Sequence, residues 1–322
     1  DVSVDETAFV PNASGGASVV YASLPLRAGG EIVVTDHGYG AVTMGAHRLA
    51  RRCGGRVRVA RIPLDAPPQA AYDAVVGELT DATCLIVIDH ITSATARLLP
   101  VDAVSVEARR RGIPVLVDGA HVPGLYDRPL DVVDCDFWIG NLHKFACAPR
   151  GAAVLVARTD RRHDLYPLID SWGAPLGFPE RFDTQGTLDL TSYLAAPRSI
   201  EFLERAWGWP TVRQHMSRLA DYAEHLIAEA FSSITGKEHR VDVGSPVNAL
   251  RLVRLPRGLA TTHADADRLR DRVARELGVE AAFTSFNSIG YYRISTHAYN
   301  TAADFEYFAE HCVPVLCAWA RT

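Results

Sequence analysis

The sequence predicts an α/β fold: a large domain with a mostly parallel sheet covered by helices on both faces, followed by a smaller α+β domain. Two observations support this prediction. In the first half of the chain, short runs rich in Val and Ile alternate with amphipathic helical patterns, which is typical of parallel strands joined by crossover helices. After Arg158 the pattern changes, and long helical stretches dominate.

The expected strands of the first half are short apolar runs, rich in β-branched residues, of the length that crosses a sheet once. Amphipathic patterns between them indicate helices. The segment from Pro100 to Arg111 begins at a proline and is followed by Gly112, residues that favour a helix start and a helix end. The expected strands cover residues 31–36, 56–63, 84–89, 114–118, 137–140 and 151–157, and the expected helices cover 39–53, 69–80 and 100–111.

The second half is expected to be mainly helical. A stretch rich in Gly, Pro and Asp, from Arg158 to Gln185, is too long to be a simple connection in a compact domain. We place a large domain at residues 1–205, then a linking helix and a small C-terminal domain at 206–322. The elements expected after the long loop are helices 191–206 and 209–233, strand 248–254, helix 265–277, strand 291–295 and helix 302–319.

Composition and charge argue against several classes of function. The 322 residues carry a net charge of −5, which argues against a nucleic-acid-binding surface. No apolar run reaches the roughly 20 residues that span a bilayer. The six cysteines form no CxxC pair, so we expect neither a disulfide framework nor a zinc site, and no metal. We interpret them as mostly buried thiols in a reducing cytoplasm.

Polar residues follow four of the expected strands, and this is where ligands bind in open α/β sheets. Because the carboxyl ends of parallel strands meet at one edge of the sheet, these side chains form a candidate site. The four groups are Asp36, His37 and Tyr39; Asp89, His90, Thr92 and Ser93; Asp118 and His121; and Asn141, His143 and Lys144.

Two of these residues, together with a helix start further upstream in the sequence, match the needs of pyridoxal phosphate. The helix start at Asn12-Ala-Ser-Gly-Gly-Ala17 offers backbone N–H groups and the Ser14 hydroxyl to a phosphate. Lys144 can form a Schiff base, and Asp118 can hold a pyridinium proton. The apolar residues around Lys144 are expected to lower its pKa by desolvation, which favours a nucleophilic amine.

Longer motifs carry a resemblance to a known family. VDGAHVPG, CDFWIGNLHKFACAPRG and QGTLDLTSYLAAP occur in order, and the match extends from PNASGG at Pro11 to YYRIST near Arg293. With them the sequence resembles the class V aminotransferase superfamily of fold-type I pyridoxal-phosphate enzymes. Within it, the sequence is similar to the isopenicillin N epimerase-like branch, which includes lyases of cysteine S-conjugates. The resemblance implies a pyridoxal-phosphate enzyme acting on an amino acid as a homodimer, with its active site at the subunit interface.

The resemblance also implies roles for single residues. Lys144 matches the Schiff-base lysine, Asp118 the partner of the pyridine nitrogen, and His121 the group near the phenolic oxygen. Arg293 matches the arginine that binds the substrate α-carboxylate, for which a bidentate guanidinium is suited. Further cofactor contacts are implied for the turn Asn12, Ala13 and Ser14, for Asn141 and His143 near the phosphate, for His37 or Tyr39 at the ring, for His90 and Ser93, and for Gly186 and Thr187 reaching the neighbouring subunit.

The sequence departs from the family pattern at several positions. Asn141 stands where relatives often have Ser or Thr. Ser93 and Ala96 stand where cysteine desulfurases have Asn and Gly, which argues against a desulfurase. The family also carries a further N-terminal segment, which we expect to be missing from this chain.

The leading functional hypothesis is β-elimination at a cysteine-derived thioether, in sulfur or natural-product metabolism. Lys144 would remove the α-proton, and Tyr39 could protonate the leaving group. The alternative is an amino-acid epimerase, which needs a second acid opposite Lys144, and a transaminase is less favoured. A non-catalytic protein of the same fold would not need Lys144, Asp118 and Arg293 together. A nucleotide-binding enzyme is disfavoured because no GxGxxG follows the first strand and no GxxxxGK[ST] occurs.

Overall fold

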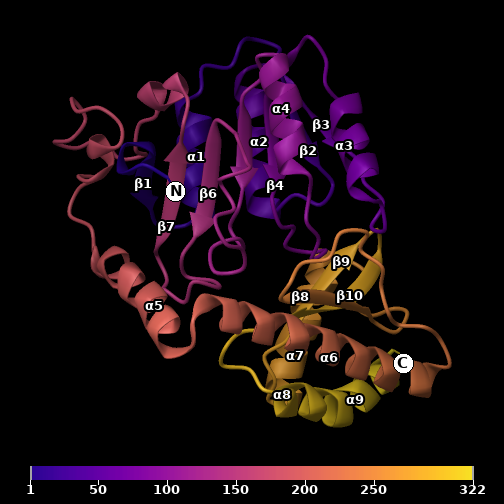
Figure 1. Ribbon diagram of the computed structural model, residues 1–322. Helices are drawn as coiled ribbons and strands as arrows, with labels where there is room; N and C mark the ends of the chain where they lie inside the picture. The colour runs from indigo at the N-terminus through magenta and orange to yellow at the C-terminus, as the bar shows by residue number, and fades with distance from the viewer. Residues whose placement is uncertain (1, 321–322) are drawn as a thin grey trace. The chain divides into compact units, whose positions relative to one another are not determined.

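The computed structural model describes residues 2–320, which form two compact units (Figure 1). The first unit holds the residues up to Thr92 together with Leu99–Ala206. The second holds the short segment Ser93–Leu98 and the residues from Trp207 onward. The second unit therefore takes a piece of chain from between β4 (Thr83–Asp89) and α4 (Val101–Arg110) of the first.

A seven-stranded mixed sheet forms the centre of the first unit, in the order β1-β7-β6-β5-β4-β2-β3. Neighbouring strands from β3 to β6 run parallel, whereas β7 is antiparallel to both β6 and β1. Because most of its strands are parallel and buried on both faces, the predicted fold class is confirmed. The strands other than β4 are β1 (Thr7–Val10), β2 (Glu31–Thr35), β3 (Arg56–Ala60), β5 (Val115–Asp118), β6 (Phe137–Asn141) and β7 (Ala153–Ala157).

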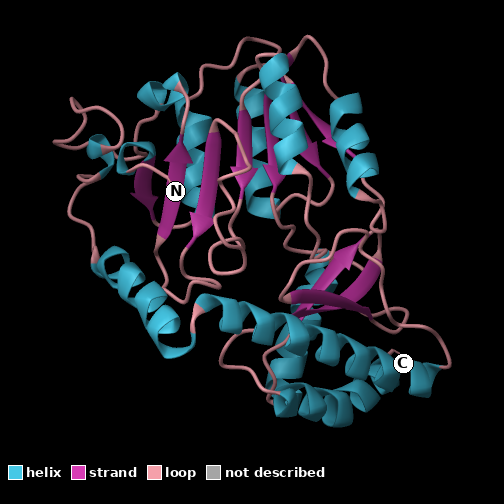
Figure 2. Ribbon diagram, in the orientation of Figure 1, coloured by secondary structure: helices cyan, strands magenta, loops and turns pink. Residues whose placement is uncertain are grey.

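Helices cover both faces of this sheet (Figure 2). On one face lie α1 (Ala13–Ser23) and α2 (Gly40–Arg52), which contact each other and pack on a core that includes Leu116 and Ile139. On the other face lie α3 (Pro68–Gly77) and α4, which also contact each other. Burial of both sheet faces explains why the strands are continuous apolar runs.

The stretch after β7 contains little regular structure. It holds two short 3₁₀ turns, Asp160–Asp164 and Glu180–Phe182, before α5 (Thr191–Trp207). A third 3₁₀ turn, Val4–Glu6, precedes β1. The expected long loop is thus largely confirmed.

The second unit is a small antiparallel sheet covered by helices. Its strands β8 (Leu250–Arg254), β9 (Ala282–Phe286) and β10 (Ile289–Ser295) are ordered β8-β10-β9. Their apolar side chains form a core with side chains from the helices. Within residues 2–320, no helix is both long and apolar enough to cross a membrane. The helices of this unit are α6 (Trp209–Thr235), α7 (His263–Leu277), α8 (Ala302–Tyr307) and α9 (Val313–Trp319), with a π-helical turn, Phe308–Cys312, joining the last two.

The expected helices and strands are all present, with ends shifted by a few residues. Three elements were not predicted: β1, the full length of α1 beyond its start, and β9. β1 (TAFV) and β9 (AFTSF) are edge strands that are only partly buried and mix apolar with polar residues, so they lack the continuous apolar runs of the buried strands. In α1, glycines and serines between the apolar residues weaken the helical pattern.

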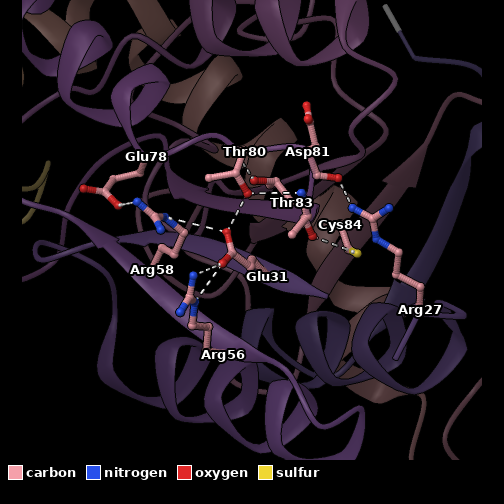
Figure 3. A network of polar contacts seen from close by, with 10 residues as sticks. Arg27, Glu31, Arg56, Arg58, Glu78, Thr80, Asp81, Thr83 and Cys84 are labelled. Carbon is pink, nitrogen blue, oxygen red and sulfur yellow. Dashed lines mark hydrogen bonds and ion pairs between the residues drawn. The ribbon is translucent and has the colours of Figure 1, made fainter. Parts of the chain in front are cut away.

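A polar network ties together the amino ends of three neighbouring strands (Figure 3). Its centre is Glu31, which is 3% exposed and accepts hydrogen bonds from Arg56 Nε over 2.7 Å and from Thr80 Oγ1 over 2.7 Å. Arg58 lies 3.8 Å from the same carboxylate and pairs with Glu78 over 2.8 Å. These bonds favour the ionised form of Glu31, so the Thr80 hydroxyl and the Arg56 guanidinium hold its pKa below the ordinary value.

We predict that Glu31→Gln destabilises the protein by about 1–2 kcal/mol at neutral pH, because the change removes a charge-assisted acceptor from a buried position. A depressed carboxyl pKa stabilises the folded state at pH values above the unfolded pKa of about 4.3, and this contribution is lost as the pH falls through the folded pKa. The difference between variant and wild type should therefore shrink below about pH 4.3. Urea unfolding at pH 7, 5.5 and 3.5 measures it.

Glu78→Gln is the matched control. Glu78 belongs to the same network, but its side chain is 32% exposed, so its loss should cost under about 1 kcal/mol. A Glu31→Gln effect that equals the Glu78→Gln effect, or that stays constant down to pH 3.5, would contradict the prediction.

Candidate active site

The carboxyl ends of β4, β5 and β6 bring acidic and basic side chains to one edge of the sheet. Asp89 and Asp118 are the last residues of β4 and β5 and are paired in register. Residues paired across neighbouring strands lie about 5 Å apart and point to the same face. Lys144 follows three residues after the end of β6.

Both carboxylates are buried, at 4% exposure for Asp89 and 3% for Asp118. Burial raises the pKa of each, and the charge of Asp118 raises that of Asp89 further. The positive charge of Lys144 acts in the opposite direction on both. Backbone N–H groups also favour the ionised forms: Ala120 donates to Asp118 over 3.0 Å and Tyr39 to Asp89 over 3.2 Å.

The Lys144 amine contacts His121. Lys144 Nζ lies 3.1 Å from His121 Nε2, a distance at which the ammonium donates to an unprotonated ring nitrogen. His121 is buried, and its ring lies 6.4 Å from that of Phe145 between centroids. We expected apolar surroundings for Lys144, but its partly buried side chain also contacts a histidine and interacts with the charges of two carboxylates.

The start of α1 lies beside the end of β6. Gly16 allows this close approach, because a Cβ at that position would lie 2.8 Å from Ile139 Cγ2. Asn141, at the end of β6, accepts a hydrogen bond from Ala13 N–H over 2.8 Å. Asn12 caps the helix by accepting from Gly15 N–H over 2.8 Å. Between them, the N–H and hydroxyl of Ser14 donate to no group in the described residues, so they are available to an anion.

His143 also lies in the turn after β6. Its Nδ1 lies 2.8 Å from the Ala152 carbonyl oxygen, which places the hydrogen on Nδ1. Partial burial lowers the pKa of His143, and the charges of Lys144 and Arg150 lower it further. The second ring nitrogen, Nε2, therefore carries no hydrogen and can accept a hydrogen bond from a ligand.

The structure places His37 and Tyr39 differently, although both follow β2. His37 is 2% exposed and its Nε2 lies 2.8 Å from the Ile62 carbonyl oxygen. Tyr39 is the residue before α2, and its side chain is 44% exposed. Of these two, Tyr39 is the one linked to the acidic pair, through its N–H on Asp89.

Of the remaining predicted residues, His90 joins this group through its backbone, because its N–H donates to the Asp118 carbonyl oxygen over 2.8 Å. His90 is buried with its Nδ1 unbonded within residues 2–320, and burial lowers its pKa to about 4, so it is neutral at physiological pH. Ser93 belongs to the second unit and accepts from Arg293 Nη1 through its carbonyl oxygen, over 2.7 Å, and its hydroxyl, over 3.1 Å. Gly186 and Thr187 are exposed.

The sequence places Asp89 in the candidate site without giving it a role, and it does not indicate Tyr21 as functional. Asp89 ends its strand just as Asp118 does, and only the strand register shows that the two are neighbours. Tyr21 of α1 is buried, donates to the Val42 carbonyl oxygen over 3.0 Å, and has its pKa raised by burial and by the charges of Asp118 and Asp89. Its ring packs on Gly45, where a Cβ would lie 2.6 Å from Tyr21 Cε2. Because the helical pattern of α1 is weak, the sequence did not indicate Tyr21.

Comparison with known proteins agrees with this fold. A family model described as aminotransferase class-V matches residues 2–308. Isopenicillin N epimerase of Streptomyces clavuligerus is 31% identical over 320 residues, which cover 94% of this chain and 78% of the relative. A putative L-cysteine desulfhydrase of Oryza sativa subsp. japonica is 29% identical, with 94% of this chain and 69% of the relative covered.

A solved structure also superposes on nearly the whole chain. It is the complex of the cystine C–S lyase C-DES with its product cysteine persulfide, with a TM-score of 0.78 and 17% identity. The match covers 97% of this chain and 81% of the lyase. The chain therefore belongs to the class V aminotransferase family, whose enzymes use pyridoxal phosphate.

Proposed function

We propose that the protein is a pyridoxal-phosphate-dependent C–S β-lyase that acts on a cysteine S-conjugate. The overall reaction would convert the conjugate and one water into a thiol, pyruvate and ammonium. The observation that carries the proposal is the Lys144 amine, held 3.1 Å from His121 Nε2 beside two buried carboxylates. The desulfhydrase relative, 29% identical, supports the same class of reaction.

The described residues fit the cofactor at both of its ends. Ser14, at the start of α1, offers an N–H and a hydroxyl to the phosphate. His143 would act beside it as an acceptor, because its Nε2 carries no hydrogen in the neutral ring and would pair with a protonated phosphate oxygen. Asp118 is a buried carboxylate, which favours a positively charged partner such as a protonated ring nitrogen. When bound, pyridoxal phosphate would supply an electron sink for the charge left when Cα loses a proton.

The protein would move protons and hold the substrate. Lys144 Nζ would take the proton from Cα, and His121, in contact with that nitrogen, would orient the amine. The Tyr39 hydroxyl, on an exposed side chain at the start of α2, would protonate the departing sulfur. Arg293, whose Nη1 is held by Ser93, would bind the α-carboxylate.

An amino-acid epimerase is the second candidate. It is favoured by the 31% identity to the Streptomyces clavuligerus epimerase. Such an enzyme returns a proton to Cα from the opposite side and releases no thiol, so the two reactions share the first step at Lys144 and differ in their products.

The lysine content gives this proposal a sharp test. Lys144 and Lys237 are the only two lysines among the 322 residues. Treatment of the pyridoxal-phosphate-loaded protein with borohydride should attach the cofactor to the peptide containing Lys144. Lys144→Ala should abolish that label and lower the rate of pyruvate release from S-substituted cysteines at least about a hundredfold, because a general base contributes 10²–10⁴-fold. Mass spectrometry and a pyruvate assay measure the two effects.

Lys237→Ala is the matched control and should keep both the label and the rate. Labelling of Lys237 in place of Lys144 would overturn the cofactor site. Exchange and inversion at Cα without pyruvate would instead identify the epimerase and reject the lyase.

We predict different outcomes for two changes at Asn141. Asn141→Ala removes the acceptor of Ala13 N–H and should both destabilise the protein by about 1 kcal/mol and weaken binding of pyridoxal phosphate. Asn141→Asp keeps an acceptor at the positive end of α1 and should retain stability, while its negative charge should weaken cofactor binding about tenfold or more. Thermal unfolding and cofactor titration separate the effects; equal cofactor affinity in wild type and Asn141→Asp would contradict a phosphate site here.

We also propose that the protein forms a homodimer through the segment 166–202, which contains Gly186 and Thr187. Many large apolar side chains are exposed along it, as expected for a protein–protein interface. A second copy covering this segment would bring Gly186 and Thr187 to the neighbouring site, as the family resemblance implies. We keep a cytoplasmic location as a prediction. The exposed side chains are Tyr166, Leu168, Ile169, Trp172, Leu176, Leu188, Leu190, Leu194, Ile200 and Phe202.

The double change Leu194→Asp and Phe202→Asp should convert the dimer into a 35.1 kDa monomer and weaken cofactor binding. These side chains are 75% and 62% exposed on α5, so their loss leaves the core of one chain intact. Sedimentation velocity measures the mass. Val132→Asp, at a 74% exposed site outside the segment, is the control and should remain dimeric. A double variant that stays dimeric, or a monomeric wild type, would contradict the interface.

A further inference from the structure

The second unit contains a cavity of about 890 Å³ that no predicted site residue lines. Its walls come from the end of α6, from the turns that follow β8 and precede β10, and from the end of α9. We call it the basic cavity, because its lining includes Lys237, Arg254 and Arg257. The volume lies within the range of 300–1,000 Å³ typical of small-molecule sites.

Its three cationic side chains have no acidic partner. Within residues 2–320, none of Lys237, Arg254 and Arg257 forms an ion pair or a side-chain hydrogen bond. One acidic residue, Glu238, also lines the cavity, but its carboxylate accepts from Arg240 N–H over 2.8 Å. The lining thus carries three positive charges and one negative charge, in a chain whose net charge is −5. This local excess of positive charge favours an anion.

The cavity also has an apolar part. Leu255 and Cys317, each 3% exposed, line it together with Pro256, Leu259 and Ile289. An inorganic anion would leave the exposed parts of this lining, chiefly at Ile289, which is 38% exposed, in contact with water. A ligand that carries an apolar body on its anionic group would cover them, and each Å² of apolar surface removed from water contributes roughly 25 cal/mol.

The walls of the cavity are held by hydrogen bonds and close packing among the residues around it. The His239 ring contacts the Arg254 carbonyl oxygen through Nδ1 over 2.5 Å and Thr235 Oγ1 through Nε2 over 2.8 Å. Arg254 N–H in turn donates to the His239 carbonyl oxygen over 2.9 Å. The start of β10 lies directly on the turn that follows β8, since a Cβ at Gly290 would lie 2.1 Å from the Leu259 carbonyl oxygen. A preformed cavity loses less entropy on binding than one that must be ordered.

We propose that the basic cavity binds a monocarboxylate with an aliphatic or aromatic body. Arg254 and Arg257 bind the carboxylate, for which a guanidinium offers two parallel donors. Lys237 adds a third positive charge, and the apolar lining takes the body of the ligand.

The test uses the full chain saturated with pyridoxal phosphate, so that the proposed active site is filled. Isothermal titration with decanoate should show one saturable site. Decanol has the same chain without the charge, and acetate has the charge without the chain. Both should bind at least about tenfold more weakly, because each lacks one of the two contacts. Equal binding of decanol and decanoate would reject the anion site, and a lack of saturable decanoate binding would reject the proposal as a whole.

Variants locate the binding. Arg254→Glu with Arg257→Glu should weaken decanoate binding at least about tenfold. The Lys substitutions at both positions keep the charge but lose the paired donors, so they should weaken binding less than the Glu substitutions do. Arg257→Glu alone, in an exposed turn, serves if the double variant fails to fold. Arg218→Glu is the matched control, because Arg218 is exposed on α6 of the same unit and does not line the cavity. Equal loss in Arg218→Glu and Arg257→Glu would show nonspecific attraction and overturn the site.

Discussion

Two carboxylates buried next to each other, Asp89 and Asp118, impose the constraint on which the candidate site depends. A buried negative charge needs a positive charge or hydrogen-bond donors nearby, and two such charges repel each other. The parallel register of β4 and β5 brings the pair together, and three groups respond to it: the Lys144 ammonium, Ala120 N–H and Tyr39 N–H. The turn after β6 and the start of α2 are therefore fixed by the same charges.

Close packing near these acids sets the position of the hydrogen-bond donors at the start of α1. Tyr21 lies close enough to the acidic pair for their charges to raise its pKa. Gly16 allows α1 to approach β6 closely, so that Asn141 accepts a hydrogen bond from Ala13 N–H. Asn141 accepts from Ala13 N–H, and the Asn12 side chain accepts from Gly15 N–H. Within residues 2–320, the N–H and hydroxyl of Ser14 are therefore the donors left at this helix start. An anion drawn there by the helix dipole thus meets a small, defined set of donors.

Most of this arrangement follows from patterns that are visible in the sequence, and the exceptions have identifiable causes. Buried parallel strands show as apolar runs, so their polar ends, including Asp118 and Lys144, could be predicted. The pairing of Asp89 with Asp118 depends on strand order and register, which no local pattern reports. The contact of Ser93 with Arg293 joins residues 200 positions apart, and it places a piece of chain adjoining β4 in the second unit. The basic cavity is likewise formed by turns distant in sequence.

The cation beside the two acids is a lysine and not an arginine, and this choice shows whether charge balance alone accounts for it. The chain has 33 lysines and arginines, and only Lys144 and Lys237 are lysines, so arginine supplies nearly all of its positive charge. An arginine after β6 would also balance Asp89 and Asp118, and its five donors would bond them more extensively. A guanidinium keeps its proton at any physiological pH, however, and can act neither as a base nor as an amine nucleophile. A lysine at position 144 therefore supports the proposed role of a reactive amine at the sheet edge, because the buried acids alone do not require it.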